Sequence, residues 1–150
     1  MLVKEIMTTA VRSVGPDTPM LEIGSIMCLY RISGLPVIDD EDTLVGFIAE
    51  KDVLHFLFPS IEEVMSGMGN VDPSSMPGKY KELANLTAKD LMATKVITAS
   101  PEMPLLKATS LMVGNRFRRI PVAEGKRLVG MLSLGDVHKA IFHQYVSTKH

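Results

Sequence analysis

Four side chains in the C-terminal half have the types and spacing of a site for a sugar phosphate. Ser133 and Asp136 are three residues apart where an apolar run ends, and Arg118 and Arg119 directly precede another apolar run. A carboxylate accepts hydrogen bonds from two neighbouring hydroxyls, the arrangement in a ribose diol. Guanidinium groups are bidentate donors to phosphate oxygens, and a helix N-terminus favours an anion. These residues predict a sugar-phosphate site, provided that the fold brings them to one edge.

The same residues also have a purely structural interpretation. Ser133-x-x-Asp136 is the pattern of a capping box, which by itself would explain both residues. An arginine run such as 116–119 is typical of a solvated loop. The residue types leave the two interpretations open, so the elements that carry them have to be considered.

An internal repeat predicts those elements. Residues 3–54 match residues 88–138 with an offset of 85, which becomes 84 after one residue is lost in the second turn. An ordered repeat of this kind outweighs predictions made segment by segment. The matched pieces are Val3–Met7 with Ala88–Met92, Leu35–Val37 with Ile120–Val122, Leu44–Gly46 with Leu128–Gly130, and Asp52–Val53 with Asp136–Val137.

Each copy predicts the order β-α-β-β-α over about 50 residues, too few to bury a sheet alone. The strands are expected at 11–14, 35–38 and 44–48, and at 96–99, 120–123 and 128–132. We therefore expect an α+β fold in which the two repeats pack sheet to sheet with pseudo-twofold symmetry. The expected divisions are repeat 1 at residues 1–58, a connector at 59–87 and repeat 2 at 88–150. Pairing of the last two strands would bring Arg118, Arg119 and Ser133 to one sheet edge.

Composition excludes several classes of protein. The net charge of −1 shows no basic surface for a nucleic acid, and no apolar run approaches the ~18 residues of a membrane span. Because the first residues also lack the apolar core of a signal peptide, we expect a soluble cytoplasmic chain. The single cysteine, Cys28, excludes an intramolecular disulfide and is expected to be buried. Without a catalytic triad, a P-loop or a metal-ligand cluster, we expect no enzyme, no metal and no cofactor.

The ordered set of motifs resembles tandem CBS domains, the Bateman module. The motifs are DLM, SPEMPL, RRIPV and LVGMLSLGD in the second copy, most of them matched in the first, and the resemblance spans the chain except the connector. It implies two repeats with two clefts between them that bind adenine nucleotides or related adenosyl ligands without chemistry. It also implies that such pairs dimerise.

The resemblance implies a role for each residue of the second-repeat site. Asp136 would contact ribose, Ser133 ribose or phosphate, and Arg118 and Arg119 phosphate. The base would pack against segments 8–12 and 32–34. The residues concerned there are Thr8, Arg12, Ile32, Ser33 and Gly34.

The first repeat departs from this pattern. Asp52 is retained, but Ala49 replaces Ser133, and Ser33 and Gly34 stand where the arginines are. Lys51 is a cation that could compensate in part. We expect a weaker or empty site at Asp52, and an Asp52 that is merely solvated fits the sequence equally well.

The leading hypothesis is a regulatory, energy-sensing module that binds AMP, ADP or ATP and signals by changing repeat or dimer geometry. It would act as a homodimer, with an unidentified protein as its target. One alternative is a protein-interaction module with no bound nucleotide. Another is a sensor of S-adenosylmethionine or NAD, which would share the ribose contact but need the arginines less.

Overall fold

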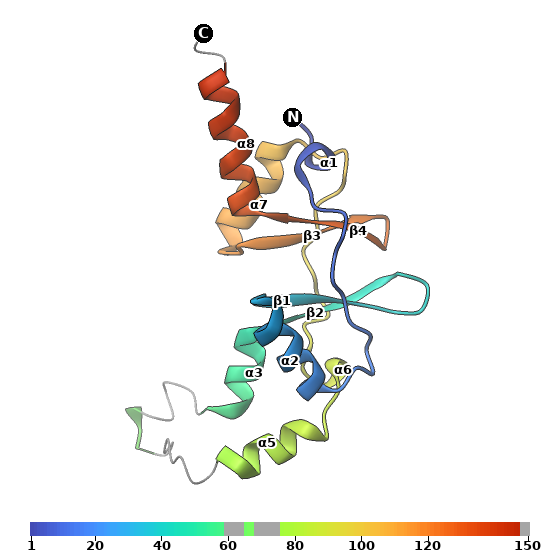
Figure 1. Ribbon diagram of the computed structural model, residues 1–150, viewed down its shortest axis with the longest axis vertical. Coiled ribbons are helices and arrows are strands. Elements are labelled where there is room, and N and C mark those ends of the chain that lie inside the picture. Colours follow the sequence, from blue (N-terminus) through green and yellow to red (C-terminus); the bar gives the residue numbers. More distant parts are fainter. Residues whose placement is uncertain (59–64, 68–75, 148–150) are drawn as a thin grey trace. The chain divides into compact units, whose positions relative to one another are not determined.

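The computed structural model describes residues 1–58, 65–67 and 76–147 (Figure 1). Residues 61–65, within the connector, have a sequence compatible with a helical turn, and most of them lie outside these ranges. The helices are α1 (Val3–Ile6), α2 (Met20–Tyr30), α3 (Glu50–Leu57), α5 (Met76–Ala84), α6 (Ala88–Leu91), α7 (Leu105–Asn115) and α8 (Leu134–Ser147). The strands are β1 (Gly34–Ile38), β2 (Leu44–Ala49), β3 (Arg119–Glu124) and β4 (Arg127–Ser133).

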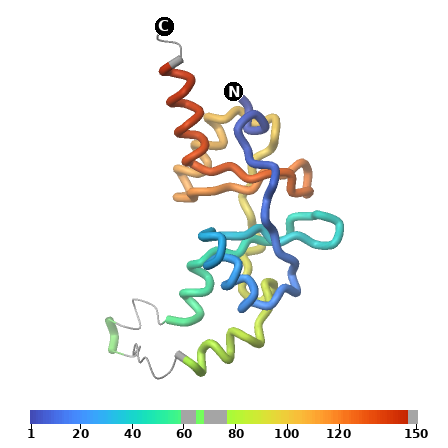
Figure 2. Tube along the Cα trace, in the orientation of Figure 1, coloured from blue at the N-terminus to red at the C-terminus, as the bar shows by residue number. Residues whose placement is uncertain are grey.

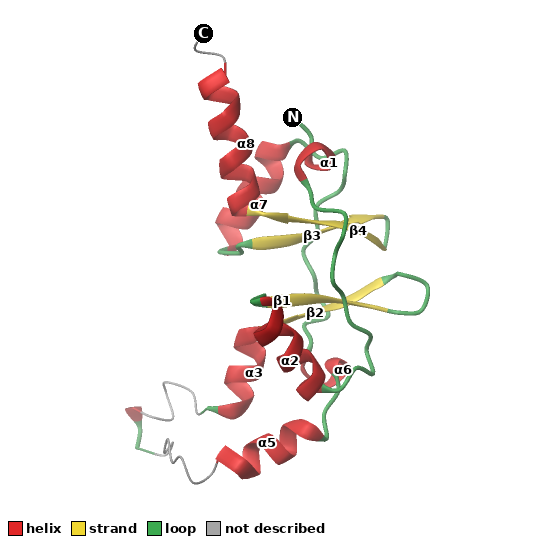
Figure 3. Ribbon diagram, viewed as in Figure 1, coloured by secondary structure: helices red, strands yellow, loops and turns green. Residues whose placement is uncertain are grey.

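The strands form two small sheets, β1 with β2 and β3 with β4, so the predicted α+β class is confirmed (Figure 3). The predicted hairpin strands are confirmed and are slightly longer than expected. The predicted strands at 11–14 and 96–99 were too long. Each is reduced to one parallel bridge, Val14 with Val37 and Ala99 with Val122.

The chain divides into two compact units that do not follow the order of the repeats. Unit 1 consists of Met1–Arg12, Glu41–Leu44 and Ile97–His150, and unit 2 of Ser13–Asp40 and Val45–Val96. The first twelve residues, which belong to the first repeat in sequence, therefore pack with the hairpin of the second. Figure 2 traces this N-terminal segment, in blue, past β4.

The start of each repeat thus belongs to the unit of the other repeat: residues 1–12 lie in unit 1 and residues 88–96 in unit 2. We call these the exchanged segments, and each adds a short edge to a hairpin. The backbone N–H and C=O of Thr8 both bond to Met131 of β4, at 2.8 and 2.9 Å, and Ala93 bonds in the same way to Phe47 of β2. A Cβ atom on Gly130 would lie 2.8 Å from the sulfur of Met7 and 3.0 Å from the carbonyl oxygen of Thr8. The glycine of the repeated Leu-Val-Gly motif is therefore explained by this close backbone approach.

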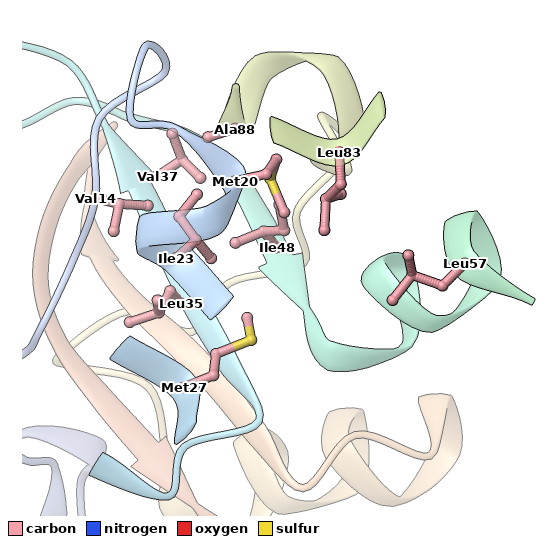
Figure 4. Packing of buried hydrophobic residues seen from close by; sticks show 10 residues of the cluster. All are labelled: Val14, Met20, Ile23, Met27, Leu35, Val37, Ile48, Leu57, Leu83 and Ala88. Carbon is pink, nitrogen blue, oxygen red and sulfur yellow. The ribbon is translucent and has the colours of Figure 1, made fainter. Parts of the chain in front are cut away.

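The two units have matching hydrophobic cores. In α2 the buried residues are Met20, Ile23 and Met27, which pack with residues of β1 and β2 (Figure 4). In α7 they are Leu105, Ala108 and Met112, at the same spacing of three and four residues. This spacing places them on one helix face, which is the periodicity that the sequence showed.

An exposed ion pair ties each exchanged segment to its unit. In unit 1 the Lys4 ammonium lies 2.9 Å from Glu102, and in unit 2 Lys89 lies 2.8 Å from Asp17. The hydrogen bond and charge of Glu102 raise the pKa of Lys4, and Asp17 does the same for the pKa of Lys89. The pairs occupy equivalent positions of the two repeats.

Two further observations concern the surface. The expectation of a buried Cys28 was wrong, because the thiol lies on the exposed side of α2, away from Met27 and the core. Among the helices that the structure describes, none has the length and apolar character needed to cross a membrane.

Candidate functional site

The β3–β4 register places Arg119 directly opposite Ser133. The next pair, Ile120 with Leu132, is fully buried in the core of unit 1, whereas Arg119 is exposed and Ser133 half-buried. Because successive side chains of a strand alternate between faces, Arg119 and Ser133 share the face that points away from this core. The predicted meeting of an arginine with Ser133 at one sheet edge is confirmed for Arg119.

Arg118 is held at the same end by its backbone. Its carbonyl oxygen accepts the N–H of Leu134, the first residue of α8, at 2.9 Å, and its side chain is exposed. In unit 2 the carbonyl of Ser33 accepts the N–H of Glu50, the first residue of α3, at 2.8 Å. The two hairpins therefore end in the same backbone geometry, but only the second carries arginines there.

Ser133 caps α8. Its hydroxyl oxygen accepts the backbone N–H of Asp136 at 3.1 Å, which confirms the capping interpretation of the sequence pattern. The hydroxyl proton is not used by this bond and can be donated to an acceptor outside the helix.

The Asp136 carboxylate has no hydrogen bond or ion pair within the part of the chain that the structure describes. It is half-buried in the first turn of α8, where the helix dipole favours a negative charge. Only half of a capping box forms here, since the serine caps the helix and the carboxylate does not reciprocate. Both of its oxygens are open to accept hydroxyl donors.

The first-repeat carboxylate behaves differently. Asp52 accepts the backbone N–H of Ala49, the residue before α3, at 2.8 Å. A ligand would have to compete with this internal bond. The structure thus gives a physical reason for the sequence-based expectation of a weaker site at Asp52. Lys51, the suggested compensating cation, is exposed in the same turn of α3.

The segments suggested for the base fall in different units. Thr8 is in unit 1 and lies beside Met131, two residues before Ser133, and Arg12 ends the same segment. Ile32, Ser33 and Gly34 belong to unit 2, and their contact with a base remains a prediction.

Packing explains two of the unit 2 residues without a ligand. Ile32 packs against the unit 2 core, and its N–H donates to the carbonyl of Met27 at 3.1 Å, closing α2. A Cβ atom on Gly34 would lie 2.6 Å from the ring of Phe47, so a glycine is required there for packing. The small size of Gly34 is therefore accounted for inside unit 2.

Sequence reasoning missed Met131. It is half-buried and lies on the same side of β4 as Ser133, between Thr8 on one edge and Pro121 of β3 on the other. The alternation in Val-Gly-Met-Leu-Ser could have identified it, since residues 131 and 133 must share a face. It is an apolar surface next to the candidate sugar-phosphate residues.

The described residues contain no group of three or more His, Cys, Asp and Glu side chains that could hold a metal ion.

Comparison with known proteins identifies the family. The CBS domain model matches residues 3–59 and 88–143. The chain belongs to the CBS domain family. Its two CBS repeats form a CBS pair, the arrangement of regulatory modules.

Relatives of this CBS pair include parts of longer proteins. Inosine-5'-monophosphate dehydrogenase of Methanocaldococcus jannaschii is 33% identical over 90% of this chain, but the match covers only 22% of that enzyme. CBS domain-containing protein YhcV of Bacillus subtilis is 27% identical over 90% of this chain and 81% of its own length. A crystal structure of CBSX2 in complex with AMP has a TM-score of 0.75 at 24% identity, covering 96% and 98% of the two chains. No catalytic role follows from the match to the dehydrogenase.

Proposed function

We propose that this CBS pair binds an adenine nucleotide (AMP, ADP or ATP) at the end of the β3–β4 hairpin and acts as a regulatory sensor. The ribose hydroxyls donate to the Asp136 carboxylate, Ser133 donates its hydroxyl proton to a ribose or phosphate oxygen, and Arg118 and Arg119 hold the phosphate. Thr8, Arg12, Ile32, Ser33 and Gly34 contact the base.

The observation that carries this proposal is the open carboxylate of Asp136. A half-buried carboxylate in a helix turn commonly accepts a backbone N–H, as Asp52 does at 2.8 Å. In the second repeat the Ser133 hydroxyl accepts the Asp136 N–H, and the Asp136 carboxylate accepts no hydrogen bond from the described residues. The cross-strand pairing then adds a guanidinium donor beside Ser133. A ribose with a phosphate matches both groups at once.

The phosphate requirement separates the adenine nucleotides from the other adenosyl ligands considered. S-adenosylmethionine offers a ribose but no phosphate, so it leaves Arg118 and Arg119 unpaired. NAD offers a pyrophosphate within a larger ligand. The exposure of both arginines favours a ligand with terminal phosphate oxygens.

Signalling would follow from differential affinity. A nucleotide that binds one relative arrangement of the repeats more tightly than another shifts the population toward that arrangement. The proposed module works in the cytoplasm as a homodimer and passes this change to a protein target. AMP is the ligand in the CBSX2 crystal structure, which supports the choice of nucleotide class.

Calorimetry with AMP, ADP, ATP, S-adenosylmethionine and NAD tests the proposal on the wild-type chain and on Asp136→Ala. We expect saturable binding of at least one adenine nucleotide and a loss of roughly tenfold or more in Asp136→Ala, because a hydrogen bond to a charged group contributes about 1.5–3 kcal/mol. Asp52→Ala is the matched control and is expected to bind nucleotide at the second-repeat site as the wild type does.

Two results would reject the proposal in different ways. Binding by none of the five compounds would leave the protein-interaction alternative as the better account. Nucleotide binding that Asp136→Ala leaves unchanged would show that the site lies elsewhere.

A further inference from the structure

Three arginine side chains lie at the end of unit 1 where β3 begins. Arg116, Arg118 and Arg119 are all exposed, and none of the three side chains has an ion pair or a hydrogen bond to another residue that the structure describes. Like charges this close repel one another unless an anion lies between them. The proposed phosphate site uses only Arg118 and Arg119, so Arg116 is a third cation beside it.

The backbone holds these arginines close together. The N–H of Arg116 donates to the carbonyl of Val113 at 3.2 Å, where α7 ends. The carbonyl of Arg118 accepts the first N–H of α8 at 2.9 Å, and Arg119 pairs with Ser133 across the hairpin. Because three residues of chain span at most about 11 Å between Cα atoms, the three side chains start within that distance of one another.

The first repeat has one arginine in place of three. Arg31 aligns with Arg116, whereas Ser33 and Gly34 align with Arg118 and Arg119. Arg31 and Arg116 both follow their helices in the left-handed conformation, with φ of 53° and 60°. A cation at a helix C-terminus interacts favourably with the helix dipole, which accounts for an arginine at this position in either repeat. The second repeat differs in having two more arginines directly after it.

A single phosphate group is too small for three guanidinium groups. It has three terminal oxygens, and two bidentate guanidiniums together with the Ser133 hydroxyl already engage all of them. A second phosphate adds further oxygens and further negative charge directly beside the first. A nucleoside diphosphate or triphosphate therefore gives Arg116 an acceptor that a monophosphate lacks.

We propose that Arg116 is a specificity-determining residue that binds the second phosphate of the nucleotide, so that the site prefers an adenosine diphosphate or triphosphate to AMP. This inference rests on the proposed function, because it needs the ribose at Asp136 and the first phosphate at Arg118 and Arg119. The preference is electrostatic and involves exposed groups, so it decreases as the ionic strength rises.

Calorimetry with AMP and ADP at one ionic strength tests the inference on the chain of residues 1–150 and on Arg116→Gly. We expect the wild type to bind ADP roughly tenfold or more tightly than AMP, because charge-assisted hydrogen bonds have effects of this size. In Arg116→Gly this ratio is expected to fall close to one, while AMP binds nearly as well as to the wild type. Glycine adopts a φ of 60° without strain, so this variant should keep the fold.

Arg31→Gly is the matched control. It removes one positive charge from the same left-handed position of the first repeat, and it should leave the ratio of ADP to AMP affinity as in the wild type. Arg116→Lys keeps the charge but loses the bidentate donor, so its ratio should lie between those of the wild type and Arg116→Gly. A purely structural role in ending α7 would instead shift the thermal midpoint of Arg116→Gly and lower both affinities together.

Failure of this inference can be told apart from failure of the proposed function. Binding of AMP by the wild type as tightly as ADP would overturn the inference and leave the nucleotide site in place. A preference for ADP that Arg116→Gly retains would also overturn it, because another group would then hold the second phosphate. Binding of neither nucleotide would reject the proposed function and this inference with it.

Discussion

Arg119 and Ser133 stand directly opposite each other on β3 and β4, on the sheet face away from the unit 1 core. The next pair along the hairpin, Ile120 and Leu132, is completely buried. The change from a buried pair to an exposed guanidinium beside a hydroxyl occurs within one residue of each strand. The guanidinium and the hydroxyl therefore lie where α8 begins. Asp136 is in the first turn of this helix, and its carboxylate accepts no hydrogen bond from the described residues.

Arg119→Ala is expected to weaken AMP binding by roughly tenfold or more and to leave adenosine binding unchanged, because only AMP offers a phosphate to the guanidinium. Calorimetry with both ligands measures this difference. Arg127→Ala is the matched control, since Arg127 is exposed at the opposite end of the same hairpin, paired with Glu124. Equal losses for AMP and adenosine would contradict a phosphate role for Arg119.

Asp52→Ala is expected to lower the free energy of unfolding by about 1 kcal/mol more than Asp136→Ala does. Both aspartates lie in the first turn of a helix and interact similarly with its dipole, but only Asp52 accepts a backbone N–H. Urea unfolding of the two variants measures the difference. Ser133→Ala should behave like Asp52→Ala, because it removes the cap of α8. Indistinguishable unfolding of the two aspartate variants would refute this assignment of caps.

Gly130→Ala is expected to destabilise the fold by about 1–3 kcal/mol, because the new methyl group has no room beside Met7 and Thr8. Gly114→Ala, in α7, is the control. Nothing lies within 4 Å of a Cβ atom there, so alanine should stabilise that helix by up to about 1 kcal/mol. Thermal unfolding of both variants checks the opposite signs. A neutral Gly130→Ala would show that the N-terminal segment does not lie against β4.

Glu102→Gln is expected to lower the pKa of Lys4 toward its ordinary value of 10.5, because the carboxylate raises it through a hydrogen bond and its charge. A raised lysine pKa stabilises the folded state below pH 10.5, and this contribution is lost as the pH rises through the folded pKa. The stability difference between wild type and variant should therefore shrink in strongly alkaline solution.

An NMR titration of the lysine side chains measures this shift. Lys89, which is paired with Asp17, serves as the internal reference and should not respond to Glu102→Gln. An unchanged pKa for Lys4 would mean that the ion pair with Glu102 does not form in solution.

Local patterns predicted much of the site. The hairpin strands and their pairing follow from alternation and turn residues, and this pairing alone places Arg119 beside Ser133. The same patterns could not show that Cys28 is exposed, since an apolar helix presents both a buried and a solvent side. Nor could they show that Gly34 is small because the Phe47 ring occupies the space beside it.

The sequence by itself determined the order of the elements, because helices and strands follow from residues only a few positions apart. It also contains the internal repeat and the residue types at the end of the second hairpin. Tertiary structure decided which segment completes each hairpin, as Thr8 does for β4 and Ala93 for β2. It also decided that Asp52 caps its helix whereas Asp136 does not, although the two residues are aligned in the repeat. Contacts between distant segments, and which backbone N–H each capping side chain reaches, are settled only when the chain is folded.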